Sequence, residues 1–328
     1  MELSPIRGQA TSPTNRLVQF MRQHPLLCYF LIALGFSWAY ELIVWGILHA
    51  PTSLPWLGPL NFVFTLGPTL AAFLMTAVTQ GRAGIRQLLR RYVLWRVGIV
   101  WYLLVLPGVL VLMLLPYLLL PGAFSAFRLS VLSSPRFWLP FLILYVAAFI
   151  AGGSLGEEPG WRGFALPRLQ QRFGPLVGTF ILGVPWGLWH LPQFLFIPGN
   201  FPGFNGAGTG FIGSLVPIVL FVIMVMALAY VFTWVFNNTR GSLLLAMLLH
   251  TSINTASIML PYLFPSLALA TNLLFGLSQS LVWVVLAVLI IAVTRGRLSY
   301  QRYQREMARP SPVTDRGQEQ GGTASISV

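Results

Sequence analysis

The sequence has very little negative charge. Only seven of its 328 residues are aspartate or glutamate, and charged residues of both signs make up 8% of the chain. A typical soluble domain carries about 25% charged residues, so the shortfall argues against water as the main solvent around this fold. Hydrophobic residues make up 56% of the chain, and several apolar runs reach the roughly 20 residues that a helix needs to cross a bilayer. We therefore predict an integral membrane protein.

Lysine is absent and cysteine is nearly so. All 20 basic residues are arginine, and Cys28 is the single cysteine. Cys28 alone cannot form an internal disulfide, so no redox compartment is indicated. The net charge of +13 could suggest nucleic-acid binding, but most arginines lie in short segments between apolar runs or near the chain ends. That pattern is typical of membrane topology, so we expect the lipid bilayer as a partner and no nucleic acid.

The apolar runs are long and do not alternate, which excludes the pattern of a transmembrane barrel. The fold class is therefore predicted as all-α, a polytopic transmembrane helical bundle of about eight spans. The predicted spans are 26–48, 56–78, 99–120, 137–155, 175–196, 211–236, 242–264 and 273–294.

Arginine placement predicts the orientation. With an even number of spans, the arginine-rich segments fall on one side, and the opposite connections hold only Arg128 and Arg136. The positive-inside rule then places both termini in the cytoplasm. We expect a multi-pass protein of the inner or plasma membrane. The first apolar run is too long for a signal peptide and should remain as an anchor. Residues 82–97 mix arginines with apolar residues and could lie along the inner headgroup layer.

Ionisable residues inside the apolar runs are functional candidates, because lipid makes them costly. They are Glu41, Glu157, Glu158, Arg162, His190 and His250. Glu157 and Glu158 end the fourth predicted span, and Pro159 should break or kink the helix there. Glu158 and Arg162 are four residues apart and can pair if Pro159 opens a fresh turn. Glu41 has no assigned role; it could pair with an arginine or line the same cavity.

Two acids, two imidazoles, an arginine and an amide on three helices are suited to hydrolysis. A carboxylate or imidazole can take a proton from water, and polar donors can stabilise the charge that develops on an attacked carbonyl. Asn254 follows His250 by one helical turn on the same face. Alternatively, Glu157, His190 and His250 could ligate zinc with an open position for water. The residue types alone leave both chemistries open.

Other intramembrane proteases need residues whose presence can be checked in the sequence. An aspartyl protease needs two membrane aspartates, and the only aspartate is Asp315 near the C-terminus. A helical H-E-x-x-H zinc motif is absent. The stretch GGSLG places Ser154 in a G-x-S-x-G pattern, so a serine-type protease using Ser154 with His190 or His250 remains an alternative. The simpler interpretation of Gly152 and Gly153 is close helix packing.

Three motifs together resemble the CAAX-protease and bacteriocin-processing family of intramembrane proteases, abbreviated CPBP or Abi. They comprise Glu157, Glu158 and Arg162 (Glu-Glu-x-x-x-Arg), Trp186 and His190 (Phe-x-x-x-His, with Trp186 in the aromatic position), and His250 and Asn254 (His-x-x-x-Asn). The resemblance covers about residues 137–264 and implies a four-helix catalytic core. It also implies an intramembrane endopeptidase.

The resemblance implies a role for each motif residue. Glu157 would be the general base that activates water, with His190 helping to hold it. His250 and Asn254 would stabilise the oxyanion, and Glu158 would orient Arg162 or support the site. The family has been described both as metal-dependent and as glutamate-dependent without metal. We favour the second, while a divalent metal such as zinc stays open as a cofactor.

The chain is accordingly divided into five parts. These are a cytoplasmic N-terminal tail (1–25), an N-terminal transmembrane region (26–136), the protease-like core (137–264), a last transmembrane helix (265–295) and a disordered cytoplasmic tail (296–328). The expected substrate is a membrane protein or peptide that could be lipidated. Two non-protease alternatives are a non-catalytic immunity or binding protein of the same fold, and a transporter with carboxylates at a helix break.

Overall fold

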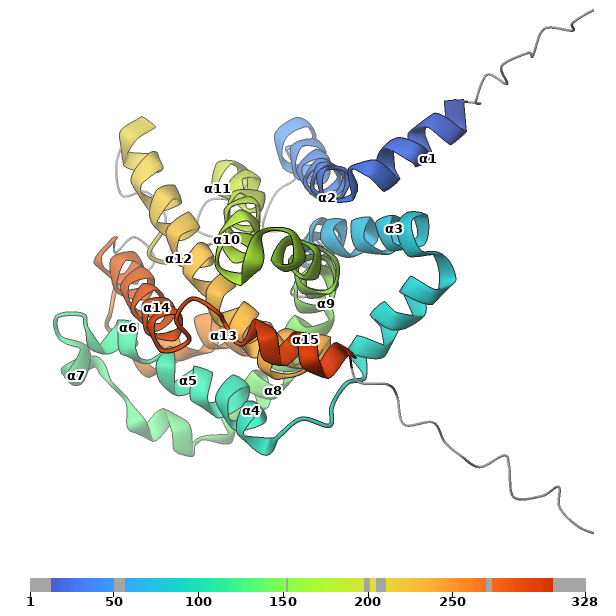
Figure 1. The fold of residues 1–328 in the computed structure, drawn as a ribbon. Helices are drawn as coiled ribbons and strands as arrows, with labels where there is room; N and C mark the ends of the chain where they lie inside the picture. Colours follow the sequence, from blue (N-terminus) through green and yellow to red (C-terminus); the bar gives the residue numbers. More distant parts are fainter. Residues whose placement is uncertain are drawn as a thin grey trace, which may run out of the picture.

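A computed structural model describes residues 13–49, 57–151, 153–197, 201–204, 211–269 and 273–308 (Figure 1). The described residues form helices joined by turns, and no strand occurs among them. The predicted all-α bundle is therefore confirmed. Residues 1–12 of the predicted N-terminal tail and 309–328 of the predicted C-terminal tail lie outside the described residues.

Seven helical stretches of the described chain are long and apolar enough to cross a membrane. They are Pro25–Ile47, Phe62–Tyr92, Ile99–Leu118, Pro135–Phe196, Leu215–Asn238, Leu243–Leu263 and Leu273–Val293. The fourth is 62 residues long and contains two of the predicted spans. A straight helix of that length would measure about 90 Å, three times the roughly 30 Å hydrocarbon core. The count differs from eight because this stretch bends without a long connecting loop, and the chain is a multi-pass membrane protein.

The first layer is formed by α1 (Pro13–Gln23), α2 (Pro25–Glu41) with its π-helical extension η1 (Leu42–Ile47), and α3 (Leu57–Tyr92). Helices α2 and α3 approach each other closely at Gly67. A Cβ on Gly67 would lie 2.6 Å from the carbonyl oxygen of Ala33. The Ser37 hydroxyl donates to the Phe64 carbonyl at 2.7 Å. At Gly81 the backbone is non-helical, and the rest of α3 runs back toward α15 (Figure 1).

The predicted third span is not one continuous α-helix. It consists of α4 (Ile99–Leu103), η2 (Leu104–Gly108), α5 (Val109–Leu112) and α6 (Leu115–Leu118), followed by α7 (Ala123–Ala126) and η3 (Leu129–Ser133). Pro107 lies inside η2, and Pro116 is the second residue of α6. Each proline removes a backbone donor and interrupts the α-helical hydrogen-bond ladder, which explains the short pieces.

The next stretch carries the glutamate doublet. It consists of α8 (Pro135–Ala151), α9 (Ser154–Glu158), η4 (Pro159–Ala165), α10 (Leu166–Trp189) and α11 (Leu191–Phe196). The break or kink predicted at Pro159 is a wide π-helical turn, η4, through which the helix continues. Helix α10 bends at Gly174, where φ is 77°. Pro175 then begins the membrane-crossing part, as the sequence predicts.

The remaining helices are α12 (Phe211–Asn238), α13 (Leu243–Met259), η5 (Leu260–Leu263), α14 (Leu273–Val293) and α15 (Tyr300–Ala308). Helix α12 packs between α10 and α14, while α13 contacts α8, α9 and α12. Most residues of α13 are buried, so this helix lies in the interior. The interior helix carries His250 and Asn254.

The prediction of disorder from residue 296 is wrong for Tyr300–Ala308, which forms α15. Tyr303 is 6% exposed, and its hydroxyl accepts a hydrogen bond from Arg91 Nη2 at 3.0 Å. The Leu298 carbonyl accepts a second bond from Asn237 Nδ2 at 2.8 Å. These tertiary contacts fix a polar segment whose composition alone suggests disorder.

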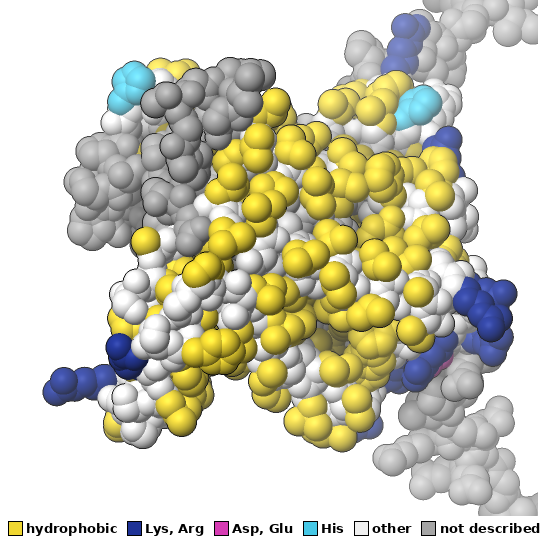
Figure 2. Space-filling view, turned by 90° about the vertical axis from the view of Figure 1, so that its left-hand side faces the viewer, with side chains coloured by type: hydrophobic (Ala, Val, Ile, Leu, Met, Phe, Trp, Pro, Cys, Tyr) yellow, Lys and Arg dark blue, Asp and Glu magenta, His cyan; other side chains and the backbone are white. Residues whose placement is uncertain are grey.

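The outside of the bundle is strongly hydrophobic. Large apolar side chains such as Val293, Val111 and Leu142 are exposed. On the face in Figure 2, hydrophobic side chains cover the middle, and arginine side chains lie at the margins. Such a surface is expected where lipid tails, and not water, surround the middle of the protein.

Candidate active site

The glutamate doublet lies inside the protein and not at a charged edge. Glu157 is 3% exposed, Glu158 and Arg162 are fully buried, and His250 is 7% exposed. Helix α9 supplies the two carboxyl groups, η4 the guanidinium and α13 the imidazole. Four ionisable side chains from three elements therefore meet in one buried cluster.

Glu158 holds two cationic or donating partners at once. Its Oε1 accepts from Arg162 Nη1 at 2.9 Å and from His250 Nδ1 at 2.8 Å. The pairing of Glu158 with Arg162 across Pro159 is thus confirmed. Because an ionised carboxylate only accepts hydrogen bonds, we assign the Nδ1 proton to His250. This leaves the Nε2 edge of the imidazole facing Glu157.

Glu157 has one oxygen engaged and one oxygen facing His250. Its Oε2 accepts from the indole nitrogens of Trp186 at 2.9 Å and Trp161 at 3.3 Å. Its Oε1 lies 3.8 Å from His250 Nε2, which is too long for a direct hydrogen bond. A water molecule beside this pair could bond to both atoms. The carboxylate of Glu157 is thus placed as a base, and the imidazole of His250 as a donor, on either side of such a water.

Gly153 keeps the space beside this pair open. Its φ is 101°, and a Cβ built there would lie 2.5 Å from Glu157 Oε1 and 3.7 Å from His250 Nε2. The interpretation of Gly153 as a helix-packing residue is therefore wrong, and Gly152 lies outside the described residues. Close packing is instead provided by Gly156 and Gly160, where a Cβ would meet the α3 backbone at 2.6 Å and 2.5 Å.

Arg162 sits between two aromatic rings. Its Cζ lies 3.8 Å from the centre of the Trp186 ring and 4.2 Å from that of Phe232. Desolvated cation–π contacts of this kind are worth about 2 kcal/mol. Trp186 thus serves twice, since its ring covers the guanidinium and its N–H donates to Glu157. The aromatic position of the second motif is part of the cluster.

His190 reaches the cluster through Trp186. It follows the last residue of α10, and its Nδ1 lies 3.0 Å from the Trp186 carbonyl oxygen. Its ring is half-buried and packs edge-on against Trp189 and Phe221. Asn254 lies one turn after His250 on α13 and is also half-buried. The direct contacts therefore join Glu157, Glu158, Arg162 and His250, with His190 connected through the Trp186 backbone.

Ser154 has a different hydrogen bond from the one that the serine-type alternative requires. Its hydroxyl lies 2.8 Å from the Thr251 hydroxyl, which itself donates to the Met247 carbonyl. Ser154 is fully buried. Its hydroxyl therefore ties α9 to α13 next to His250, which is a packing role.

The zinc alternative needs three converging ligands. Within the described ranges, no group of three His, Cys, Asp or Glu side chains is placed to hold a metal ion. Glu157 and His250 face each other, whereas the Nδ1 of His190 is turned to the Trp186 carbonyl. As arranged, these residues do not fit a three-ligand zinc site.

Glu41 is fully buried at the end of α2. Neither of its carboxyl oxygens has a hydrogen-bond partner among the described residues. An arginine partner, one of the two possibilities considered for Glu41, is therefore not found in that part of the chain.

Sequence reasoning missed three residues of the site. Trp161, Phe232 and Gly153 were not predicted, although Trp161 follows Glu157 by one helical turn. That spacing was the available signal for Trp161. The positions of Phe232 and Gly153 depend on how separate helices pack, and no local pattern marks them.

The fold and the cluster define a polytopic membrane protein with a buried acid–imidazole–guanidinium site. Residues 136–256 match the family described as type II CAAX prenyl endopeptidase Rce1-like, a segment that includes all six predicted site residues. "CAAX prenyl protease 2" of Methanococcus maripaludis is 28% identical over 187 residues, which cover 55% of this chain and 62% of that relative. Both matches confirm the predicted resemblance to the CAAX-protease and bacteriocin-processing family.

Proposed function

We propose that this chain is an intramembrane endopeptidase in which Glu157 activates the attacking water. The observation that carries the proposal is the environment of the Glu157 carboxylate. It is buried, one oxygen is held by two indole N–H groups, and the other faces His250 Nε2 at 3.8 Å. The family match over residues 136–256 supports the same reaction class.

The proposed reaction follows from this geometry. A water beside Glu157 Oε1 gives its proton to the carboxylate while its oxygen attacks the scissile carbonyl carbon. The carbon–nitrogen bond of the resulting tetrahedral intermediate then breaks, and Glu157 passes the proton to the leaving amine. One water is consumed, and a carboxyl and an amine are released.

The neighbouring residues would position the reacting groups and stabilise the negative charge that develops on the attacked carbonyl. His250 offers Nε2–H to the oxyanion when its ring carries both protons, and Asn254 supplies an amide donor from the next turn. Glu158 holds the imidazole through Nδ1 and is itself paired with Arg162. Trp186 connects His190 to Glu157.

The substrate class is proposed from the relatives. The family description and the name of the archaeal relative both refer to CAAX prenyl proteases. We propose a membrane-anchored protein or peptide as substrate, with a prenylated C-terminus as the first candidate. The arginine asymmetry supports cytoplasmic termini and an inner or plasma membrane location.

The test uses full-length protein in liposomes with a library of membrane-anchored peptides, prenylated and unmodified. Glu157→Gln should lower the cleavage rate about 10²- to 10⁴-fold, the usual contribution of a general base. Glu306→Gln, which alters a peripheral ion pair on α15, is the matched control and should cleave at the wild-type rate. Ser154→Ala should also remain active.

Repeating the assay with a chelator separates a glutamate-dependent from a metal-dependent mechanism, because a glutamate-dependent enzyme keeps its rate when metals are removed. The proposal fails if Glu157→Gln cleaves as fast as wild type. It also fails if the wild type cleaves no member of the library, which is the outcome that the non-catalytic alternative predicts.

A further inference from the structure

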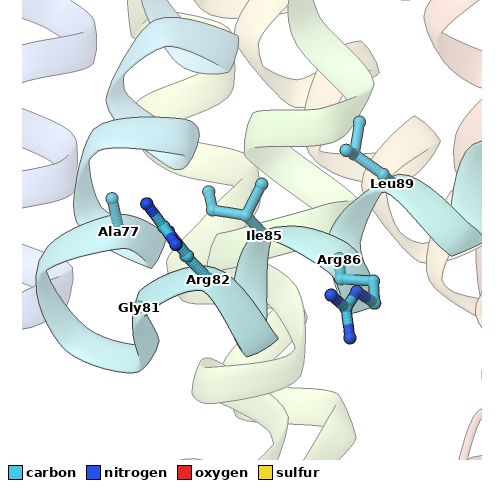
Figure 3. Close-up of a pocket in the computed structure, with 6 residues that line it drawn as sticks. All are labelled: Ala77, Gly81, Arg82, Ile85, Arg86 and Leu89. Carbon is cyan, nitrogen blue, oxygen red and sulfur yellow. The ribbon is translucent and has the colours of Figure 1, made fainter.

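An open groove lies on α3, away from the buried cluster. Its volume is about 400 Å³, and it is lined by Ala77, Gly81, Arg82, Ile85, Arg86 and Leu89 (Figure 3). The lining thus combines apolar side chains with two guanidinium groups.

Gly81 creates the groove. Its φ of 62° and ψ of −154° belong to a region that essentially only glycine adopts, and the helix changes direction there. In the segment after the bend, residues 82, 85, 86 and 89 follow helical face spacing. Figure 3 shows Ala77, Arg82, Ile85 and Leu89 on one side of the bent helix, while Arg86 points the other way from the same segment.

The depth of Gly81 in the membrane follows from length. The span that contains it begins at Phe62 and runs for 31 residues, more than the roughly 20 needed to cross. At 1.5 Å per residue, the part from Phe62 to Gly81 covers about 28 Å. This nearly equals the hydrocarbon thickness, so Arg82 and Arg86 lie at the headgroup layer.

The charge of the groove is not balanced by the protein. Four carboxylate side chains occur in the part of the chain that the structure describes. Three of them are buried elsewhere, and Glu306 pairs with Arg302. A third arginine lies close by, because Arg22 of α1 donates to the Val78 carbonyl at 2.9 Å. Arg82 and Arg86 are therefore exposed cations without a carboxylate partner among the described residues.

We infer that this groove binds an anionic phospholipid. The phosphate pairs with the Arg82 guanidinium, since guanidinium groups bind phosphate oxygens in charge-assisted hydrogen bonds. Arg86, whose side chain points to the other side of the segment, adds to the positive potential around the headgroup (Figure 3). The first part of an acyl chain lies along Ala77, Ile85 and Leu89. A site that joins cations to an apolar wall at headgroup depth suits a lipid better than a free anion.

The binding test uses full-length protein in nanodiscs of phosphatidylcholine with increasing phosphatidylglycerol. Native mass spectrometry counts the lipids retained on the protein. The Arg82→Gln/Arg86→Gln variant should bind phosphatidylglycerol about 30-fold more weakly, given the usual attraction of a basic residue to an anionic membrane surface. Retention of phosphatidylcholine should not change.

The matched control is Arg295→Gln/Arg297→Gln, which removes two exposed arginines after α14. It should bind phosphatidylglycerol within about twofold of wild type, if the groove and not the overall charge matters. Equal losses in both double variants, or no loss in either, would overturn the inference.

Two further arms distinguish a lipid from its headgroup. Ala77→Trp fills the groove without removing charge, and should weaken phosphatidylglycerol binding although both arginines remain. Inorganic phosphate and glycerol phosphate, at the lipid's effective concentration, should not displace the retained lipid; displacement would reassign the groove to a free anion. Each variant is checked for unchanged thermal unfolding in phosphatidylcholine alone, and none of these measurements depends on peptidase activity.

Discussion

Glu157 and Glu41 are both buried carboxyl groups in the same bundle, yet their surroundings differ. Glu157 accepts two indole hydrogen bonds and faces an imidazole. Both oxygens of Glu41 have no hydrogen-bond partner among the described residues. Burial makes either group costly, but only the first is surrounded by side chains from α9, η4, α10 and α13. A buried acid therefore indicates a reactive site when donors from several helices converge on it.

The largest effect is expected when the buried ion pair beside Glu157 is broken. Glu158→Ala leaves the Arg162 guanidinium buried without its carboxylate and releases His250. We expect a loss of about 3–5 kcal/mol in the free energy of unfolding together with loss of cleavage. Denaturant unfolding in detergent micelles measures the first effect. A stability change below about 1 kcal/mol would contradict the assigned pair.

Gly153→Ala tests the open space beside Glu157. The new methyl group would lie 2.5 Å from Glu157 Oε1, so cleavage should fall about 100-fold, the cost of a misplacement near 1 Å. Gly174→Ala is the matched control, because Gly174 also has positive φ, 77°, but a Cβ at that position would have nothing within 4 Å. Both variants should lose similar stability from backbone strain, and equal cleavage by the two would remove Gly153 from the site.

Trp186→Phe separates the two functions of that side chain. The substitution keeps a ring above Arg162 but removes the N–H donor to Glu157. A hydrogen bond to a charged group is worth about 1.5–3 kcal/mol, so kcat should fall about 10- to 100-fold while KM changes little. Trp161→Phe, which removes the longer 3.3 Å bond, should have a smaller effect. A larger effect at Trp161 would reverse the assigned order of the two donors.

The smallest effect is expected at Glu41. Glu41→Leu replaces a buried carboxyl group that lacks partners among the described residues with an apolar side chain, so unfolding should become more costly by about 1 kcal/mol. Cleavage should stay at the wild-type rate. If cleavage instead falls as far as in Glu157→Gln, Glu41 would have to be part of the reaction, and the contrast between the two acids would be lost.

The residues of the cluster could be predicted because ionisable side chains are rare in apolar runs. Glu157, Glu158, Arg162 and His250 stand out for that reason, and their spacing already indicates the buried pair. Trp161 and Phe232 do not stand out, since aromatic residues make up 14% of the chain. Their positions depend on the register of helices that pack together only in the folded protein.

Helix boundaries were likewise only partly predictable from the sequence. Apolar length predicts the spans well, but it cannot show that 99–118 is divided by prolines or that 135–196 is one bent helical stretch. Helix α15 was missed because its polar composition resembles that of an unfolded tail. Its fixed position depends on partners such as Arg91, which lies 212 residues earlier in the chain than Tyr303.

His250 lies 92 residues after Glu158, with which it shares a hydrogen bond. A nascent chain inserts its helices in order of synthesis, so the glutamates enter the membrane well before the imidazole that faces them. Until α13 leaves the ribosome and packs against α9, the acidic pair has no histidine beside it. Under the proposed mechanism, a half-made polypeptide is therefore harmless to its neighbours in the translocon, and cutting begins only when the bundle has closed.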